Sequence, residues 1–542
     1  IRVRQTLQPK SVTRLGAGHY VLDYGQNFAG FPRLTVTAPA GARIEMRFAE
    51  MLKADGTVDQ ANLRTAKARD IYIAAGRGRE VYEPRFTYHG YRYVEITGVP
   101  DDAGAWSLEG LVAHQDLAET AELRVGNPMI EKFWRNSVWS QRANFYGLPT
   151  DCPQRDERLG WMGDAAVFWP AAAWNMDVTA FTARVMEDAR VSQSAKGAFP
   201  DCIPPFVPTM KLSSPGWADA GVILPHTSWM QNGDTGVIRA NWQAMEAYMG
   251  WIEAANPDHV WRKQRGADYA DWLSVDAPTT NPGAATTPKD LLSTAYWAQD
   301  ATMMAAMASA IGNIEAAARY RSLFEAIRTA FNAAFVVDGK VGNGSQTGNV
   351  VAIRFGLLSP ETMRAAGVAL AADIARRGNH LSTGFLGTPH ILDALVMSGQ
   401  EAAAITLLTQ RSYPSWGYMV EKGATSMWER WNSDQGDVGM NSRNHYAFGA
   451  ISDFLFRRIA GIAPATPGFG RVRIAPIMSA VLGSGGATYQ SVRGTIRTDW
   501  TARDGAFRLD VELPAGVEGE VILPGGRKAR AVAGPNRYSG KL

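Results

Sequence analysis

Cysteine is nearly absent from this sequence: only Cys152 and Cys202 occur among 542 residues. Two cysteines cannot form the disulfide framework that stabilises many small secreted domains. They leave open one bridge in an oxidising compartment or two free thiols, and we expect free thiols.

Long apolar runs and an excess of one charge are also missing. No run approaches the roughly 20 residues of a membrane span, so we expect no membrane insertion. The net charge is only +3, from 55 basic and 52 acidic residues, which argues against nucleic acid as a partner. The chain opens at Ile1 without a methionine or a visible signal peptide. It therefore resembles a piece of a longer protein or a processed form, and localisation stays open between periplasmic or secreted and cytoplasmic.

Several catalytic motifs are absent as well. The eight histidines form no HExxH motif and no zinc spacing with cysteine, so we expect no metal and no other cofactor. Neither Gly342-Asn343-Gly344 nor the glycines of 483–486 stand between a strand and a helix, as a phosphate loop would. No GxSxG nucleophile motif is present.

The first 120 residues alternate apolar and polar side chains over short segments, which is the pattern of half-buried strands. Turn residues such as Gly25-Gln26-Asn27 separate these segments. Many short strands at this spacing predict an N-terminal β-sandwich domain over residues 1–120. The expected strands are 20–24, 33–37, 43–48, 70–73 and 91–96.

The pattern becomes helical at Asn127-Pro128, where an N-cap residue precedes a proline at the first helical position. Paired helices with Gly- and Pro-rich connections predict an α/α toroid over residues 121–462. The expected helices are 128–145, 164–174, 178–194, 235–254, 288–310, 313–334, 360–377, 388–398, 400–410 and 446–460. Functional residues are expected in the long polar connections at 195–234, 257–287 and 411–445.

Strand-like alternation returns after Pro464. It predicts a small C-terminal β-sandwich domain over residues 463–542, with strands at 471–474, 494–500, 507–513 and 520–523.

The most informative segment is 150–164, which holds four carboxylates, two arginines and a tryptophan. Charges this dense beside apolar helices are costly unless they are paired or used in chemistry. A sugar-cleaving site needs this combination, because an indole stacks on a pyranose while acids bind hydroxyls and move protons.

Glu157 is the candidate general acid of this segment. Trp161 and Asp164 follow it at +4 and +7, so a helical or closely turned segment would place all three on one face. The indole would keep water from the carboxyl group and the neighbouring acids would favour its protonated form. The alternative is an ion-pair network among the charged residues of 155–158 that caps a helix.

A second acid lies between two tryptophans, at Trp428-Glu429 and Trp431, with His445 shortly after it. Glu429 is 272 residues from Glu157, and distant positions on one toroid can supply two carboxylates to opposite sides of a pocket. The alternative is a glutamate at a helix start that pairs with Arg430.

Two further segments pair an acid with an indole in a predicted loop. They contain Trp217, within 215–221, and Asp271-Trp272, within 268–272. We interpret both as pocket walls, with ordinary loop packing as the alternative.

Together these segments resemble the bacterial α-L-rhamnosidases of glycoside hydrolase family 78, and the resemblance covers nearly the whole chain. Residues 151–164 are similar to the signature loop of that family, and the Trp217, Trp272, Glu429 and His445 segments follow in the expected order. The segments 23–30, 50–52 and 84–94 resemble its β domain before the barrel, and 467–476 resembles the opening of its C-terminal β domain.

The resemblance implies an (α/α)6 barrel, flanked by the two β-sandwiches, that removes terminal α-L-rhamnose from a small-molecule or oligosaccharide rhamnoside with inversion of configuration. Glu157 would be the general acid and Glu429 the general base. The substrate-binding residues implied are Asp151, Arg155, Trp161, Asp164, Trp217, Trp272, His445 and, by its adjacency to Glu429, Trp428.

Met162 stands where threonine is common in the family loop, and the additional β domains that often precede the barrel are missing. Two other functions stay open: another (α/α)6 inverting glycosidase, resembling fucosidases or glucoamylases, and a carbohydrate-binding protein without activity. The sequence does not indicate the aglycone, the linkage, structural calcium or the oligomeric state.

Overall fold

The computed structural model describes residues 1–542 apart from 103, 208–211, 279 and 436–437. The chain divides into two compact units. The first unit comprises Ile1–Asp116, Arg135–Gly160 and Met419–Gly449, and the second comprises Leu117–Trp134, Trp161–Tyr418 and Ala450–Leu542.

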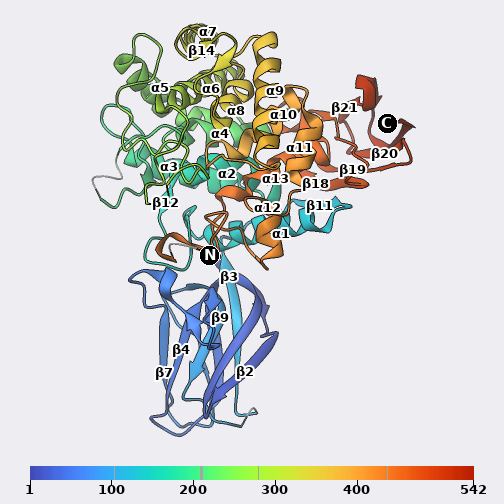
Figure 1. Cartoon of the computed structure of the whole chain (residues 1–542). Coiled ribbons are helices and arrows are strands. Elements are labelled where there is room, and N and C mark those ends of the chain that lie inside the picture. Colours follow the sequence, from blue (N-terminus) through green and yellow to red (C-terminus); the bar gives the residue numbers. More distant parts are fainter. Residues whose placement is uncertain (103, 208–211, 279, 436–437) are drawn as a thin grey trace. The chain divides into compact units, whose positions relative to one another are not determined.

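The first unit is built on an eight-stranded antiparallel sheet, whose strands are blue in Figure 1. Its order is β1 (Arg2–Leu7), β10 (Trp106–His114), β3 (His19–Thr37), β9 (His89–Thr97), β4 (Arg43–Ala49) and β7 (Arg69–Ile73), with β2 (Ser11–Gly16) and β8 (Arg79–Tyr82) also paired to β3. Alternate residues such as Ile44, Met46 and Phe48 are fully buried in the core of this unit. The pattern of alternating residues therefore predicted β4, β7 and β9 closely.

Strand β3 corrects one expectation, because it runs straight through the turn predicted at Gly25-Gln26-Asn27. Its pairing with β9 shifts register between Asp23 and Phe28, so the extra residues are absorbed as a bulge. Gly25 takes a φ of 69° there, and its N–H donates to Asp23 Oδ1 at 2.6 Å. The chain thus needs glycine at this position although it does not reverse direction.

The second unit holds most of the helices. They are α2 (Met162–Asn175), α3 (Thr179–Ser192), α4 (Ala220–Asn232), α5 (Gly236–Ala255), α6 (Lys289–Ala310), α7 (Ile314–Phe335), α8 (Gln346–Arg354), α9 (Pro360–Arg376), α10 (Ile391–Met397), α11 (Glu401–Leu408) and α13 (Ile451–Phe454). Two more, α1 (Pro128–Asn144) and α12 (Trp416–Glu421), contain a boundary between the units.

Neighbouring helices in the sequence pack as hairpins: α4 with α5, α6 with α7, α8 with α9, and α10 with α11. Helices α2, α4, α6, α8 and α10 also pack one against the next, and α13 packs on α2. Every second helix therefore belongs to an inner ring with its partner outside, which is the α/α toroid that the sequence predicted (Figure 1).

Three helices lie where the sequence predicted none: α4 within 195–234, α8, and α12 within 411–445. Helix α4 is buried on nearly all sides and contains Pro225. A helix of this kind shows no apolar stripe and carries a residue that usually ends helices, so both sequence signals fail.

The C-terminal residues form two sheets within the second unit. One has the order β11 (Ala121–Val125), β18 (Ser484–Ser491), β19 (Gly494–Arg503), β20 (Ala506–Leu513) and β23 (Gly534–Lys541). The other has the order β16 (Ile462–Pro464), β17 (Arg471–Ile474), β21 (Glu518–Ile522) and β22 (Lys528–Ala531). Strand β11 comes from before the helices, which the sequence did not indicate.

The short elements are β5 (Met51–Leu52), β6 (Val58–Asp59), β12 (Gly160–Trp161), β13 (Cys202–Ile203), β14 (Val336–Val337) and β15 (Lys340–Val341). Both cysteines are free and buried, as expected. Within the part of the chain that the structure describes, no helix is both long and apolar enough to cross a membrane.

Candidate active site

Arg155 connects the two candidate catalytic carboxylates within the first unit. Its side chain is only 1% exposed. Nε and Nη2 lie 3.0 and 2.8 Å from Glu157 Oε2, while Nη1 lies 3.0 Å from Glu429 Oε2. A planar guanidinium can contact two carboxylates at once in this way, and a lysine ammonium cannot do so with the same geometry.

This bridge limits the distance between the two acids. Nη2 of Arg155 is 2.8 Å from Glu157 Oε2 and 3.3 Å from Glu429 Oε1, so these oxygens are separated by no more than the sum of the two distances. Carboxyl groups in glycosidases lie roughly 5–5.5 Å apart when the enzyme retains configuration and roughly 6.5–9.5 Å apart when it inverts. The bound applies to the nearest oxygens and is compatible with both ranges, so inversion stays a prediction.

Glu429 is held in its ionised form. It is 3% exposed, and its Oε2 accepts the Ser442 N–H at 3.1 Å. Burial alone would raise the pKa of this carboxyl, but Arg155, His445 and the Ser442 N–H outweigh burial and hold the pKa below its ordinary value. His445 is itself buried, which lowers its pKa to about 4 and keeps it neutral at pH 7.

Glu157 contacts a second arginine that sequence reasoning missed. Arg64 Nη1 donates to Glu157 Oε2 at 2.8 Å, and Arg64 follows η1 (Ala61–Leu63), more than ninety residues earlier in the chain. The Glu157 side chain is 17% exposed, against 4% for Glu429. Glu157 is therefore the more accessible acid of the two.

The ion-pair network expected among residues 155–158 forms only in part. Arg155 does pair with Glu157. Arg158 instead donates to the Tyr88 carbonyl at 3.0 Å and lies over the Tyr88 ring at 4.5 Å, and Asp156 accepts the Thr65 N–H at 3.2 Å. The local alternative for Glu429 also fails, because its arginine partner is Arg155.

Asp151 lies in the same cluster and is 2% exposed. Its Oδ1 accepts the Leu159 N–H at 3.0 Å, and Arg155 Nη2 lies 3.6 Å from Oδ2. Burial and then the nearby charge of Glu157 raise the pKa of Asp151 to about 7, against the opposing effect of Arg155. This group therefore keeps a proton up to near neutral pH.

Asp151, Cys152 and Glu157 each offer a ligand atom within 4.8 Å of the others. A metal ion does not fit this set well, because Arg155 already supplies a cation to both carboxylates. Burial also raises the pKa of the Cys152 thiol well above its ordinary value, whereas a metal needs the thiolate.

Trp428 is fully buried, and the Arg443 guanidinium lies 5.1 Å from the centre of its ring. An indole enclosed in this way has no free face for a sugar. We interpret it as part of the packing that holds Glu429.

In the second unit, the predicted indoles gather around a tyrosine that the sequence analysis had not selected. The ring of Tyr269 lies 6.0 Å from Trp161, 4.6 Å from Trp217 and 5.9 Å from Trp272, measured between ring centres. Trp161 and Trp272 are partly exposed, whereas Trp217 is buried. The only signal for Tyr269 was its place in the acid–indole segment 268–272.

Asp201 anchors this aromatic cluster. Its carboxylate accepts the Ser214 N–H at 2.7 Å and the Ser214 hydroxyl at 2.8 Å, and it is hydrogen-bonded to the Tyr269 hydroxyl. Burial raises the pKa of Asp201 to about 7. Asp201 is thus a buried acid that the sequence analysis also missed.

Asp164 is 4% exposed in the first turn of α2, two residues after the helix begins. Gly163 precedes it, and a Cβ at Gly163 would lie 2.4 Å from Trp217 Cε2. The helix therefore needs glycine there to let the indole approach its backbone.

Asp271 fastens a loop and does not face a pocket. It is 1% exposed and accepts three backbone N–H groups, of Gly384, Leu386 and Gly387, together with the Thr347 hydroxyl. For this acid the bland interpretation, loop packing, is correct.

Comparison with known protein families gives one consistent result. Residues 118–459 match the bacterial α-L-rhamnosidase six-hairpin glycosidase domain. Residues 13–114 match the bacterial α-L-rhamnosidase concanavalin-like domain, and residues 461–537 match the bacterial α-L-rhamnosidase C-terminal domain.

Individual relatives agree. An α-L-rhamnosidase of Streptomyces avermitilis is 41% identical over 530 residues, covering 97% of this chain and 50% of the relative. One of Formosa agariphila is 36% identical over 536 residues, covering 97% and 57%. The chain thus spans about half the length of the curated relatives it matches.

Solved structures show the same fold. The crystal structure of the Streptomyces avermitilis α-L-rhamnosidase complexed with L-rhamnose matches with a TM-score of 0.93 and 38% identity, covering 100% of this chain and 54% of the other. That of the Aspergillus terreus α-L-rhamnosidase matches with a TM-score of 0.95 and 32% identity, covering 99% and 64%.

Proposed function

The chain belongs to the bacterial α-L-rhamnosidase family, and from this premise we propose that it hydrolyses terminal α-L-rhamnose from rhamnosides with inversion at the anomeric carbon. Its partner would be a small-molecule or oligosaccharide rhamnoside. The observation that carries the proposal is the buried bridge from Glu157 through Arg155 to Glu429.

Glu429 is the general base. A base must be ionised to accept a proton from water, and the lowered pKa of Glu429 meets this need at neutral pH. The N–H of Ser442 and the guanidinium of Arg155 fix its oxygens, and the buried Trp428 packs beside it in the sequence.

Glu157 is the general acid. It lies close to Asp151, whose pKa of about 7 shows that this pair of acids retains a proton near neutral pH. Interacting carboxyl groups titrate as a pair, so a proton resident on Asp151 is available to Glu157. The greater exposure of Glu157 favours it as the group that meets the glycosidic oxygen.

The step then balances as follows. The proton of Glu157 passes to the glycosidic oxygen as the bond from that oxygen to the anomeric carbon breaks. A water attacks the opposite face of the sugar, and Glu429 takes the proton that this water releases. The products are the free aglycone alcohol and β-L-rhamnose.

The remaining predicted residues would hold the sugar. Arg155, Asp151 and Asp164 would bind hydroxyls, since charged groups make the stronger hydrogen bonds. Indoles offer an apolar face to the ring C–H groups. The residues assigned to the pocket lining are Trp161, Trp217, Trp272 and His445.

The test is turnover of 4-nitrophenyl α-L-rhamnopyranoside followed by proton NMR, with Glu157→Gln and Glu429→Gln alongside. We expect β-L-rhamnose as the first product and losses of at least about 100-fold in both variants, the lower range for acid–base groups. Glu325→Gln is the matched control, because Glu325 is an exposed residue of α7 paired only with the exposed Arg328.

Other outcomes would change the proposal in distinct ways. First release of the α-anomer would replace the base with a nucleophile. Turnover of an aryl fucoside or glucoside alone would keep the mechanism and discard the sugar. Rhamnose binding without any turnover would favour a non-catalytic carbohydrate-binding protein.

A further inference from the structure

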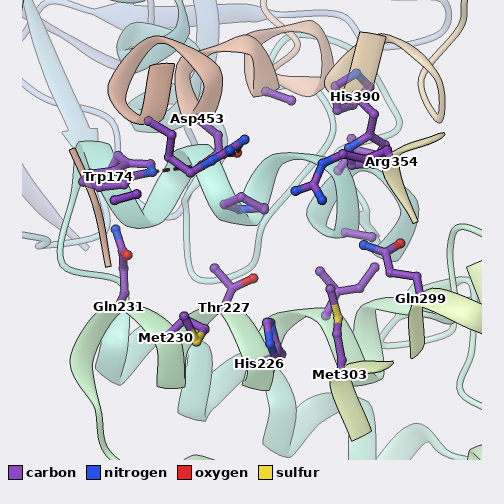
Figure 2. Close-up of a pocket in the computed structure, with 18 of the residues that line it drawn as sticks. Trp174, His226, Thr227, Met230, Gln231, Gln299, Met303, Arg354, His390 and Asp453 are labelled. Carbon is purple, nitrogen blue, oxygen red and sulfur yellow. Dashed lines mark hydrogen bonds and ion pairs between the residues drawn. The ribbon is translucent and has the colours of Figure 1, made fainter. Parts of the chain in front are cut away.

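A second pocket opens at the other end of the inner helices of the second unit. Its cavity volume is about 280 Å³. Figure 2 shows His226 and Met230 reaching into it from α4, Gln299 and Met303 from α6, and Arg354 from the end of α8.

This pocket is separate from the residues assigned to the sugar. On α2, Asp164 lies in the first turn, whereas Trp174, which lines the pocket, lies in the last. Ten residues of α-helix span about 15 Å. A ligand here would therefore not touch Asp164.

The charges beside the pocket do not balance. Arg457 bonds to both Asp453 and Asp393, and Arg458 bonds to Asp393 at 2.8 Å. These contacts leave Arg354 with a single long approach, 3.8 Å from its Nε to Asp393 Oδ2. Three guanidinium groups thus face two carboxylates, which leaves one positive charge uncompensated.

Arg354 presents that charge to the pocket. Its Nε is buried and has no hydrogen-bond partner among the described residues, and Figure 2 shows its guanidinium directed into the cavity. Burial lowers the pKa of His226 to about 4 and that of His390 to about 3, so neither histidine adds charge at pH 7. Gln299 Oε1 is likewise buried without a partner among the described residues. Buried polar atoms of this kind are normally satisfied by water or a ligand.

The other walls are apolar and adaptable. Pro170, Met230 and Met303 line the pocket and are all partly exposed there. Methionine side chains adjust to irregular shapes and contact aromatic rings favourably. An engineered cavity of about 150 Å³ already binds benzene, so 280 Å³ accommodates a six-membered ring with a charged substituent.

From these observations we infer that the pocket is a second ligand site, for a small organic monocarboxylate. Its carboxylate pairs with Arg354, and its apolar ring or chain lies against Met230, Met303 and Pro170. One negative charge on the ligand neutralises the one positive charge in excess.

The probe is 4-bromobenzoate, with 4-bromobenzyl alcohol as its neutral counterpart. Titration calorimetry on the full chain should show saturable binding of the carboxylate and binding of the alcohol at least about tenfold weaker, since a hydrogen bond to a charged group contributes that much. The bromine should give an anomalous diffraction peak within the pocket. Saturating L-rhamnose should leave the affinity unchanged.

Two variants test the two halves of the ligand. Arg354→Met should weaken 4-bromobenzoate by roughly 10- to 150-fold and leave the alcohol unaffected. Met303→Trp should fill the cavity and abolish binding of both. Arg328→Met, at an exposed arginine of α7, is the control and should change neither.

The inference is overturned if wild type binds the carboxylate no better than the alcohol, or if the bromine lies elsewhere. Unchanged affinity in Arg354→Met would also overturn it. If Arg354→Met does not fold, the comparison with the alcohol and the Met303→Trp variant decide the question. None of these measurements depends on rhamnoside turnover.

Discussion

Replacing Arg155 by methionine is the most severe single change that the structure points to in the first unit. Methionine keeps much of the side-chain volume but removes the guanidinium that contacts Glu157 and Glu429 and approaches Asp151. Three acids would then share a buried site with only Arg64 at its edge.

The expected cost follows from the burial of this network. Removing one partner of a buried ion pair costs about 3–5 kcal/mol, because the other partner stays buried without compensation. For a unit of roughly 170 residues each kcal/mol shifts the midpoint by about 2–4 °C, so the transition should fall by roughly 6–20 °C. Without Arg155 the pKa values of Asp151 and Glu429 rise. A raised folded-state pKa gives stability that is lost as pH rises, so the fall should be larger at pH 8 than at pH 5.

Differential scanning calorimetry at the two pH values measures this effect. Arg158→Met is the matched control, since Arg158 lies in the same loop but contacts only the carbonyl and ring of Tyr88 among these partners, and it should cost about 1 kcal/mol. A fall below 2 °C in Arg155→Met, or an equal fall at both pH values, would refute the reasoning.

Three more predictions concern the second unit. Gly163→Ala should lower stability by about 1–3 kcal/mol and raise KM for the aryl rhamnoside, because its new methyl group displaces the Trp217 indole; unchanged kinetics would contradict this. Tyr269→Ala should raise KM at least several-fold more than Tyr269→Phe, which keeps the ring contacts; equal values would show that the ring is dispensable. Burial and the neighbouring Asp219 raise the pKa of Asp300 well above its ordinary value, so wild-type stability should fall as pH rises, and Asp300→Asn should flatten that dependence in thermal unfolding between pH 5 and pH 9.

The fold was predictable where periodicity is strong. Helix α1 was expected at 128–145 and observed at Pro128–Asn144, because its N-cap and proline mark the start. Helix α4 was not predicted, since a helix buried all round has no polar face to give a period. The turn at Gly25 was wrong because β9 pairs with β3 on both sides of it, and pairing over that distance leaves no local signal.

The site was predictable as a set of residue types but not as a set of contacts. The acid–indole pattern identified Glu157 and Glu429, yet it offered Arg430 as the partner of Glu429 in place of Arg155, which is 274 residues away in sequence. It also could not find Arg64, whose contact with Glu157 depends on how η1 packs. Local sequence shows which chemistry is present, and tertiary packing decides which groups share a charge.

That sharing explains why one acid can be protonated while the other is ionised. Arg155 and Arg64 bring two positive charges to Glu157, Glu429 and Asp151, which would carry three negative charges if all were ionised. A buried site disfavours net charge, so it balances by keeping one proton, and the pKa of about 7 at Asp151 is the sign of that proton. An inverting pair needs one acid and one base at the same pH. The count of charges supplies both, and it implies that Arg64→Met, by removing one positive charge, would extend the retention of that proton to higher pH and move the alkaline limb of the kcat/KM profile upward.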